Sequence, residues 1–157
     1  MDGPPVQRYR LCERRGSINS MFEAFEHTAD LGLRIRAATL DELFAEAGVA
    51  LFSTLVEDLA SVGQGERVEI AVVGTDREYL LFDWLKELLY RFDADHLLFS
   101  RFAVTVDAGG LKGEAWGEKL DWDRHVLRNE VKAITYHGLK VEQQPGGGWL
   151  AEVIVDI

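Results

Sequence analysis

The sequence predicts an α+β protein with the form of a two-layer sandwich, in which two helices pack on a largely antiparallel sheet. Two segments with apolar residues at helical spacing are interleaved with segments in which apolar and polar residues alternate. A run of such alternating segments, joined by glycine-rich turns, follows the second helical one. The 157 residues, 47% of them hydrophobic, are enough for one domain with a buried core.

Both helices are predicted from a start signal followed by an apolar stripe. Residues 39–42, TLDE, have the spacing of a capping box, and the apolar stripe behind them extends to about residue 56. Residues 75–78, TDRE, repeat the spacing before a second helix that extends to about residue 92. Two striped helices of this kind require a sheet to cover their apolar sides.

The strands are predicted from the two-residue alternation. The segments concerned are 22–25, 31–36, 66–73, 97–107, 111–119, 130–143 and 149–157. Glycine-rich turns at 108–110 and 145–148 join the last of them.

Residues 1–20 differ from the rest of the chain. They contain the pair Pro4-Pro5 and four basic residues, at positions 8, 10, 14 and 15, without a sustained apolar period. We predict a disordered extension here, with a single folded domain over residues 21–157. A solvated tail is favoured over a segment that touches RNA.

Composition restricts the class of partner. The net charge of −10 repels phosphate backbones, so strong direct binding of nucleic acid is not expected, whereas basic protein surfaces and metal cations are suitable partners. The single cysteine excludes an intrachain disulfide and a zinc site of several thiolates. No apolar run reaches the roughly 20 residues that cross a bilayer, and the N-terminus lacks the apolar core of a signal peptide. We therefore expect a cytoplasmic protein without a membrane partner.

Motifs of common enzyme classes are absent from the sequence. It contains no HExxH, Walker, GxGxxG or GxSxG motif, and His27, His125 and His137 are each interpreted as structural hydrogen-bonding residues. The chain is therefore predicted not to be an enzyme and to have no catalytic residues.

Three places carry polar residues in unusual positions. His27-Thr28-Ala29-Asp30 interrupts two strand-like segments, and a turn in which Thr28 and Asp30 bond local amides is favoured over a ligand site. At the other end, Asp156 and the α-carboxylate of Ile157 come together. Clustered carboxylates repel one another unless a cation or a partner's Lys or Arg lies among them, and oxygen ligands suit Ca²⁺ or Mg²⁺. On these residues alone, a solvated strand end is favoured.

Lys132 is the third such residue, because it lies between Val131 and Ala133 in a strand-like segment. Either its stem lies along a sheet edge with the ammonium in water, or the ammonium balances nearby carboxylates. The first interpretation is favoured when the residue is considered alone.

Several strings of residues, in this order along residues 21–157, resemble the archease family. They are EHTADLGL (26–33), TLDELFAEAGVALF (39–52), LLFDWLKELLYRFD (80–93), GEKLDWDRH (117–125), VKAITYHGLKV (131–141) and VDI (155–157). Archeases are partners of the tRNA-splicing ligase, which joins RNA ends bearing a 2′,3′-cyclic phosphate and a 5′-hydroxyl. The resemblance therefore implies an activator that promotes guanylylation and turnover of this RNA ligase in tRNA processing and broadens its nucleotide use.

The resemblance also implies a divalent metal site and an α+β sandwich. The metal is calcium in family members, and by position its ligands here would be Asp30, Asp156 and Ile157. Lys132 matches the other position that the family's activity needs. In this hypothesis, carboxylates from the loop after the first strand and from the chain end meet at one edge of the sheet and engage the ligase near its nucleotide site.

Two other functions are weighed against this one. A general chaperone or assembly modulator of RNA-processing enzymes would bind exposed apolar segments of many clients. A metal-dependent hydrolase using His125 or His137 ranks lowest, because no arrangement of base and nucleophile is visible.

Overall fold

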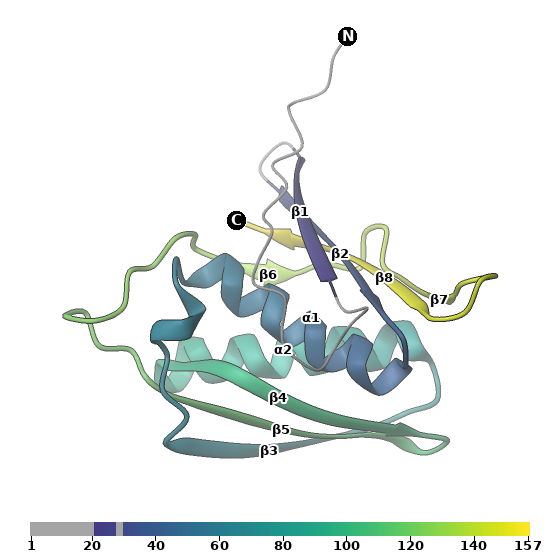
Figure 1. Cartoon of the computed structure of the whole chain (residues 1–157), viewed down its shortest axis with the longest axis horizontal. Coiled ribbons are helices and arrows are strands. Elements are labelled where there is room, and N and C mark those ends of the chain that lie inside the picture. The colour runs from purple at the N-terminus through teal and green to yellow at the C-terminus, as the bar shows by residue number, and fades with distance from the viewer. Residues whose placement is uncertain (1–20, 28–29) are drawn as a thin grey trace, which may run out of the picture.

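The computed structural model describes residues 21–27 and 30–157, without the side chains of residues 25–27. The predicted extension over residues 1–20 lies outside the described residues. The elements follow the predicted order of two strands, a helix, a strand, a helix and then a run of strands (Figure 1). No helix within the described ranges is long and apolar enough to cross a membrane.

The C-terminal strand occupies the centre of a five-stranded antiparallel sheet. One edge of β8 pairs with β2, which pairs in turn with β1, and the other edge pairs with the short strands β6 and β7. The bounds are β1 Met21–His27, β2 Asp30–Ala37, β6 Ala133–Ile134, β7 Lys140–Gln143 and β8 Trp149–Asp156.

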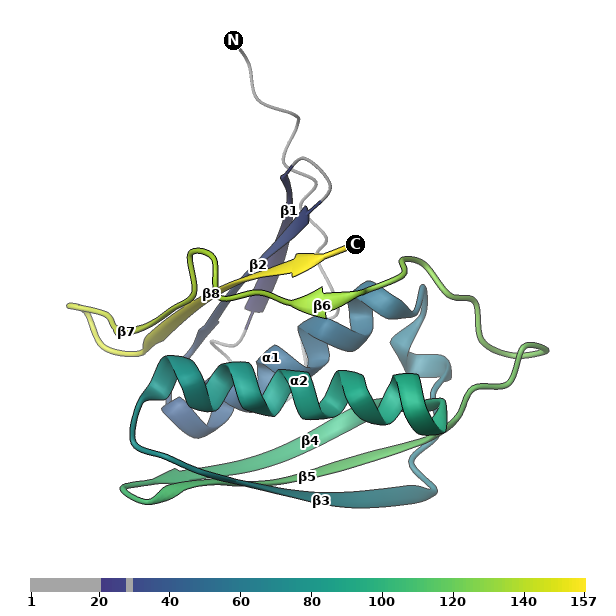
Figure 2. The ribbon, with the colours of Figure 1, turned by 180° about the vertical axis from the view of Figure 1, so that it is seen from behind.

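A second antiparallel sheet lies on the far side of the helices. It has the order β3-β5-β4, with bounds β3 Glu66–Val73, β4 Leu97–Asp107 and β5 Gly110–Lys119. Helices α1 (Leu40–Leu55) and α2 (Arg77–Asp95) lie between the two sheets (Figures 1 and 2). A one-turn 3₁₀ helix, η1 (Leu59–Ser61), follows α1.

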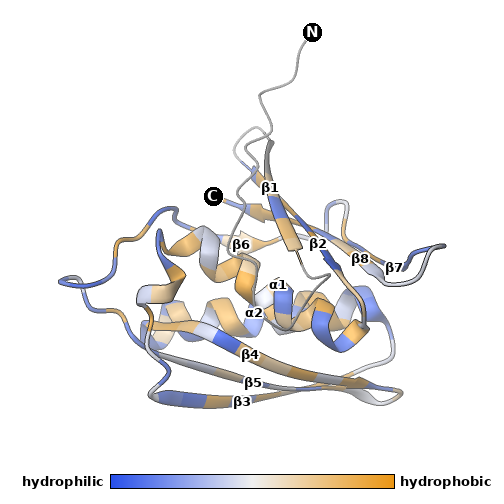
Figure 3. Cartoon of the chain, in the orientation of Figure 1, coloured by the Kyte–Doolittle hydropathy of each residue, from blue (hydrophilic) through white to orange (hydrophobic). Residues whose placement is uncertain are grey.

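The predicted α+β sandwich is confirmed, but the strands form two sheets where one sheet was predicted. The reason is visible in α1, whose residues 47–55 are all buried. A helix that is buried on every side needs cover on both sides, and the second sheet supplies it. Figure 3 shows apolar residues in both helices and in the strands above and below them.

The first helix cap is confirmed and the second is corrected. The Thr39 hydroxyl accepts a hydrogen bond from the backbone N–H of Glu42 at 3.2 Å. At α2 the cap is Asp76 instead of Thr75, because the Asp76 carboxylate accepts the N–H of Tyr79 at 3.1 Å. Aspartate caps a helix as well as threonine does, so the TDRE string alone does not decide between the two residues.

The strand predicted over residues 130–143 is wrong. It is divided into β6 and β7 by a turn, in which the N–H of Leu139 donates to the Tyr136 carbonyl at 3.2 Å and Gly138 has a φ of 67°. The Tyr136 ring stacks on Phe82 of α2, with 3.8 Å between the ring centroids. The apolar character of residue 136 therefore reflects packing on a helix and not strand alternation.

Trp84 holds the two helices and the second sheet together. Its side chain is fully buried, and the indole N–H donates to the Phe44 carbonyl of α1 at 3.0 Å. The ring lies over Gly113 of β5, where an added Cβ would come within 2.3 Å of the indole. Only a residue without a side chain leaves room for the ring at this position.

Replacing Gly113 by alanine is expected to lower the free energy of unfolding by about 1–3 kcal/mol, because the methyl group overpacks the core against Trp84. Urea unfolding measures this change. The matched control is Gly65→Ala, where no atom lies within 4 Å of the added Cβ and stability should change by less than about 0.5 kcal/mol. Equal stability of the two variants would contradict this packing arrangement.

The segment between β5 and β6 is fixed to the body of the protein at both ends. The N–H of Leu120 donates to the His96 carbonyl at 2.8 Å. Further along, the N–H of Glu57 donates to the Val126 carbonyl at 2.9 Å, and the N–H of Arg128 donates to the Leu55 carbonyl at 2.8 Å. Residues 120–128 therefore form a loop with a defined backbone.

His125 fixes the inside of this loop. Its side chain is fully buried, Nδ1 accepts the N–H of Asp121 at 2.9 Å, and Nε2 therefore carries the hydrogen that is donated to Glu118 at 2.8 Å. Arg124 binds the carboxylates of Glu118 at 2.8 Å and Asp121 at 3.2 Å. The structural role predicted for His125 agrees with these contacts.

Glu118 should make this loop sensitive to acid. The backbone N–H of Gly63, together with Arg124 and His125, holds the pKa of the Glu118 carboxyl below its ordinary value of 4.5. Its contribution to stability is therefore complete above that value and is lost as the pH falls through the lowered pKa. We expect Glu118→Gln to lower the melting temperature at pH 7, and the difference from the unmodified protein to shrink below about pH 4.

Thermal unfolding across this pH range checks the prediction. Glu66→Gln, which changes an exposed carboxylate at the start of β3, is the control. A difference between Glu118→Gln and the unmodified protein that stays constant with pH would show that the Glu118 charge does not stabilise the loop.

Candidate functional site

The register of β2 against β8 places Asp30 directly opposite Asp156. Asp30 is also opposite His27 of β1, and Asp156 is opposite Ala133 of β6, so one row of residues crosses four strands. The C-terminus lies at this end of the sheet (Figure 1). The structure therefore brings together the two aspartates that lie at opposite ends of the predicted domain.

Asp30 is the first residue of β2 and is not in the loop after β1 where the hypothesis placed it. Asp30 pairs with His27 across the connection from β1 to β2, and with Asp156 on its other side. Thr28 lies outside the described residues, so the turn in which Thr28 and Asp30 bond local amides stays a prediction.

The two aspartates belong to the face of the sheet that points away from the helices. Along β2 and β8, every second residue faces the core, and these core residues are Leu31, Leu33, Ile35, Ala151, Val153 and Val155. Asp30 and Asp156 fall in the alternate positions and are partly exposed. Directly opposed side chains on an antiparallel pair have Cβ atoms roughly 4.5–5.5 Å apart, and like charges there are destabilising.

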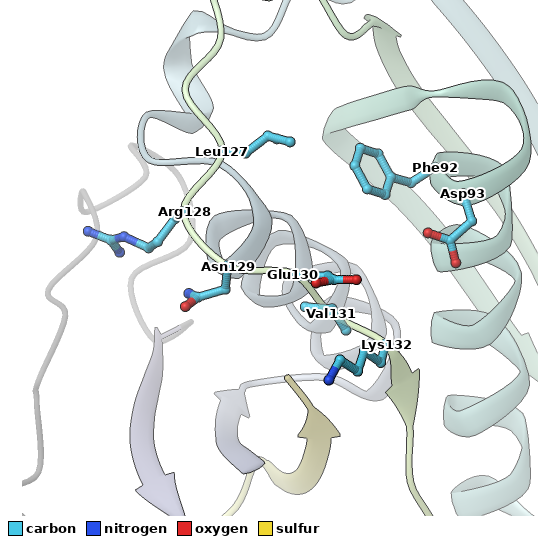
Figure 4. A pocket seen from close by; sticks show the side chains of 8 residues that line it. All are labelled: Phe92, Asp93, Leu127, Arg128, Asn129, Glu130, Val131 and Lys132. Atoms are coloured by element: carbon cyan, nitrogen blue, oxygen red, sulfur yellow. The ribbon is translucent and has the colours of Figure 1, made fainter. Parts of the chain in front are cut away.

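Lys132 is next to the same row through its backbone. Its N–H donates to the Asp156 carbonyl at 2.7 Å, immediately before β6. Its side chain is exposed, and in Figure 4 the amine is directed away from α2. Among the described residues, none of Asp30, Asp156 and Lys132 forms an ion pair.

The donor chemistry of this place fits a hard divalent cation. Two carboxylates face one another, and the α-carboxylate of Ile157 follows Asp156 directly, so the donors are all oxygen atoms. On the same face of the sheet, Arg34 is held by the carboxylates of Glu152 at 2.9 Å and Glu23 at 3.2 Å. Within residues 21–27 and 30–157, no three side chains of His, Cys, Asp and Glu form a metal-binding group. The implied set does not require three, since its third ligand is the chain end.

The three histidines that the sequence presents as structural residues, His27, His125 and His137, have different surroundings. One ring nitrogen of His125 accepts the N–H of Asp121 in the loop, and the other binds Glu118 of β5, so this ring is not free to act as a base. His137 is exposed in the turn between β6 and β7. The side chain of His27 lies outside the described residues.

A pocket of about 510 Å³ lies beside Lys132, between the end of α2 and residues 127–132 (Figure 4). Asp93 and Glu130 line it, and neither residue was predicted as a site residue from the sequence. Burial and, secondarily, repulsion from Glu130 raise the pKa of the Asp93 carboxyl above its ordinary value. The two residues come from separate elements and share no motif, so the sequence contains no signal that would join them.

Comparison with known proteins supports the family resemblance that the sequence shows over residues 21–157. The Archease protein family (MTH1598/TM1083) matches residues 22–157. The solution structure of Methanobacterium thermoautotrophicum protein 1598 has a TM-score of 0.77 and 37% identity, and the match covers 87% of this chain and 98% of that one. The match therefore extends to the fold as well as to the sequence.

Curated relatives give the same result. The chain is 44% identical over 140 residues to the protein archease of Methanopyrus kandleri, which covers 87% of this chain and 99% of the relative. It is 41% identical over 140 residues to the protein archease of Pyrococcus furiosus, with 87% and 98% covered. The family match covers the whole first sheet except Met21, and it includes Asp30 of β2 and Asp156 of β8. The chain therefore belongs to the archease family.

Proposed function

We propose that this chain activates the tRNA-splicing RNA ligase, which joins 2′,3′-cyclic phosphate and 5′-hydroxyl ends, by promoting its guanylylation and turnover. The guanylate is carried by a histidine of the ligase, so the chain itself needs no catalytic residue. Family membership supports this proposal. The observation that carries it is the convergence of Asp30, Asp156 and the Ile157 end with Lys132 at one end of a sheet.

We name Asp30, Asp156 and Ile157 together the acidic tip. Its oxygen atoms would hold a divalent cation, calcium in this proposal, and the ion would supply the positive charge that opposed carboxylates need. The pairing of β2 with β8 holds the backbone of the tip in place. A tip neutralised in this way presents a fixed shape to a partner instead of a cluster of repelling charges.

The acidic tip acts, in this proposal, by binding near the nucleotide site of the ligase. The net charge of −10 favours association with a basic, RNA-binding enzyme, and this attraction weakens with salt. A protein that binds one conformation of the ligase more tightly than another shifts its population toward that conformation. The ligase thereby becomes competent for guanylylation without any chemistry on the activator.

Asp30→Asn and Asp156→Asn test two effects of the carboxylates separately: their mutual repulsion and their binding of a cation. Without metal, each variant should be at least as stable as the unmodified protein, because the substitution removes repulsion between opposed charges. With excess calcium, the melting temperature of the unmodified protein should rise through ligand linkage, and that of the variants should not. Covalent ligase-guanylate, formed from GTP with substoichiometric activator, should accumulate at least about tenfold more slowly with either variant.

Glu66→Gln is again the control, since it removes an exposed carboxylate from the other sheet. Full activation by both aspartate variants would refute the site. No acceleration of the ligase by the unmodified protein would refute the function. Stimulation of unrelated RNA-processing enzymes to the same extent would favour the chaperone alternative.

Lys132→Met tests the residue beside the tip. The backbone N–H that donates to Asp156 remains, so folding should not change. The calcium-dependent rise in melting temperature should persist, because the ammonium is not a cation ligand. Guanylylation should fall on the order of tenfold if the ammonium contacts the ligase, and Lys132→Arg should recover part of it. Normal activation by Lys132→Met would remove this residue from the proposal.

A further inference from the structure

Trp122 is exposed on the loop at 120–128, with 73% of its surface accessible. An indole is a large apolar group, and leaving it in water gains nothing for folding. It lies in the GEKLDWDRH string, one of the strings on which the family resemblance depends. The proposed acidic tip does not use it.

The loop holds Trp122 on a rigid support. Hydrogen bonds fix the backbone on both sides of residues 121–125, and the buried His125 and the Arg124 ion pairs fix the interior. The N–H of Asp123 donates to the Asp121 carboxylate at 3.0 Å, which sets the backbone around Trp122. A side chain displayed on a preorganised loop loses little conformational entropy when a partner binds it.

The other tryptophans indicate what kind of group belongs on this ring. The Trp116 ring is covered by the guanidinium of Arg101 at 4.5 Å, and the Trp149 ring by that of Arg77 at 4.8 Å. Trp84 is buried. Of the tryptophans in the described residues that reach the surface, Trp122 alone has no cation over its ring. Tryptophan is the aromatic side chain that binds cations best.

The charges beside Trp122 favour the same kind of group. Trp122 lies between Asp121 and Asp123, and the Asp123 carboxylate forms no ion pair within residues 21–27 and 30–157. An exposed indole next to an unpaired carboxylate suits an arginine or lysine side chain. A nucleic-acid strand would instead bring phosphates toward a chain of net charge −10.

Both ribbon views place this loop on the side of the molecule toward which the C-terminus points (Figures 1 and 2). Residues 127–132 connect the loop to Lys132 along the pocket in Figure 4. One partner surface can therefore approach the acidic tip and Trp122 from the same side.

We infer that Trp122 is a docking residue, whose indole packs on an arginine or lysine of the partner protein while Asp123 pairs with that cation. The inference rests on the proposed function, in which the partner is the RNA ligase. Trp122 then contributes to affinity, whereas the acidic tip changes the nucleotide site of the ligase.

The test compares Trp122→Ala, Trp122→Phe and Asp123→Lys with Tyr90→Ala in calorimetric titrations of the ligase with full-length protein. Tyr90 is a suitable control because it is 60% exposed and lies on α2. Trp122→Ala should weaken binding about 30-fold, as expected for an interface hot spot. Asp123→Lys should also weaken it, Trp122→Phe should retain most of the affinity, and Tyr90→Ala should not change it. Melting temperature and its rise with calcium should be the same in all five proteins.

Three results would overturn the inference while the proposed function stands. In the first, Trp122→Ala binds the ligase with full affinity. In the second, this variant binds the ligase normally but no longer binds single-stranded RNA. In the third, sedimentation shows that the substitution changes only the self-association of the protein. If the unmodified protein neither binds nor accelerates the ligase, the proposed function and this inference fail together. If Trp122→Ala binds and accelerates the ligase as well as the unmodified protein does, only this inference fails.

Discussion

The pairing of β8 with β2 is the constraint on which the site depends. It is the C-terminal strand that lies in the middle of the first sheet, so the chain end is fixed by neighbours on both edges. The fully buried residues Val153, Val155 and Leu33 set its register. A slip of one residue would turn these side chains to solvent and point Asp156 into the core. The hydrophobic core therefore determines which carboxylates meet.

This register also has a cost in stability. Asp30 and Asp156 are held opposite each other by core residues, although their charges repel. The rest of the same face is neutralised internally, since Arg34 binds both Glu23 and Glu152. The unbalanced charge is thus confined to the end of the sheet, where a cation or a partner can reach it. The loop at 120–128 is similar in one respect: its backbone is fixed by hydrogen bonds, yet it exposes Trp122, a side chain that does not contribute to the core.

Local signals in the sequence were sufficient for most of the fold. Glu66–Val73 was predicted with its observed bounds, and the Thr39 cap was identified from its spacing. The errors arose where two local signals compete or tertiary packing decides. Asp76 and Thr75 are both good caps, so spacing alone does not choose between them. Tyr136 fits the alternation of a strand, although its ring stacks on Phe82 of α2. The second sheet follows from the burial of α1 on every side, which depends on tertiary packing.

The site could be predicted only as a set of residues, because neither composition nor spacing gives the register between strands more than a hundred residues apart. Resemblance supplied Asp30, Asp156, Ile157 and Lys132, and the structure shows that the first two are paired and that Lys132 bonds to Asp156. The most direct test of the proposed metal site is calorimetric titration with calcium alone of the unmodified protein, of a chain extended by Gly-Gly after Ile157, and of one extended at its N-terminus. The extension after Ile157 replaces the α-carboxylate by an amide, so we predict one bound ion whose affinity falls more than about tenfold for that chain only. Equal affinity of all three proteins, or no binding by any of them, would contradict the account.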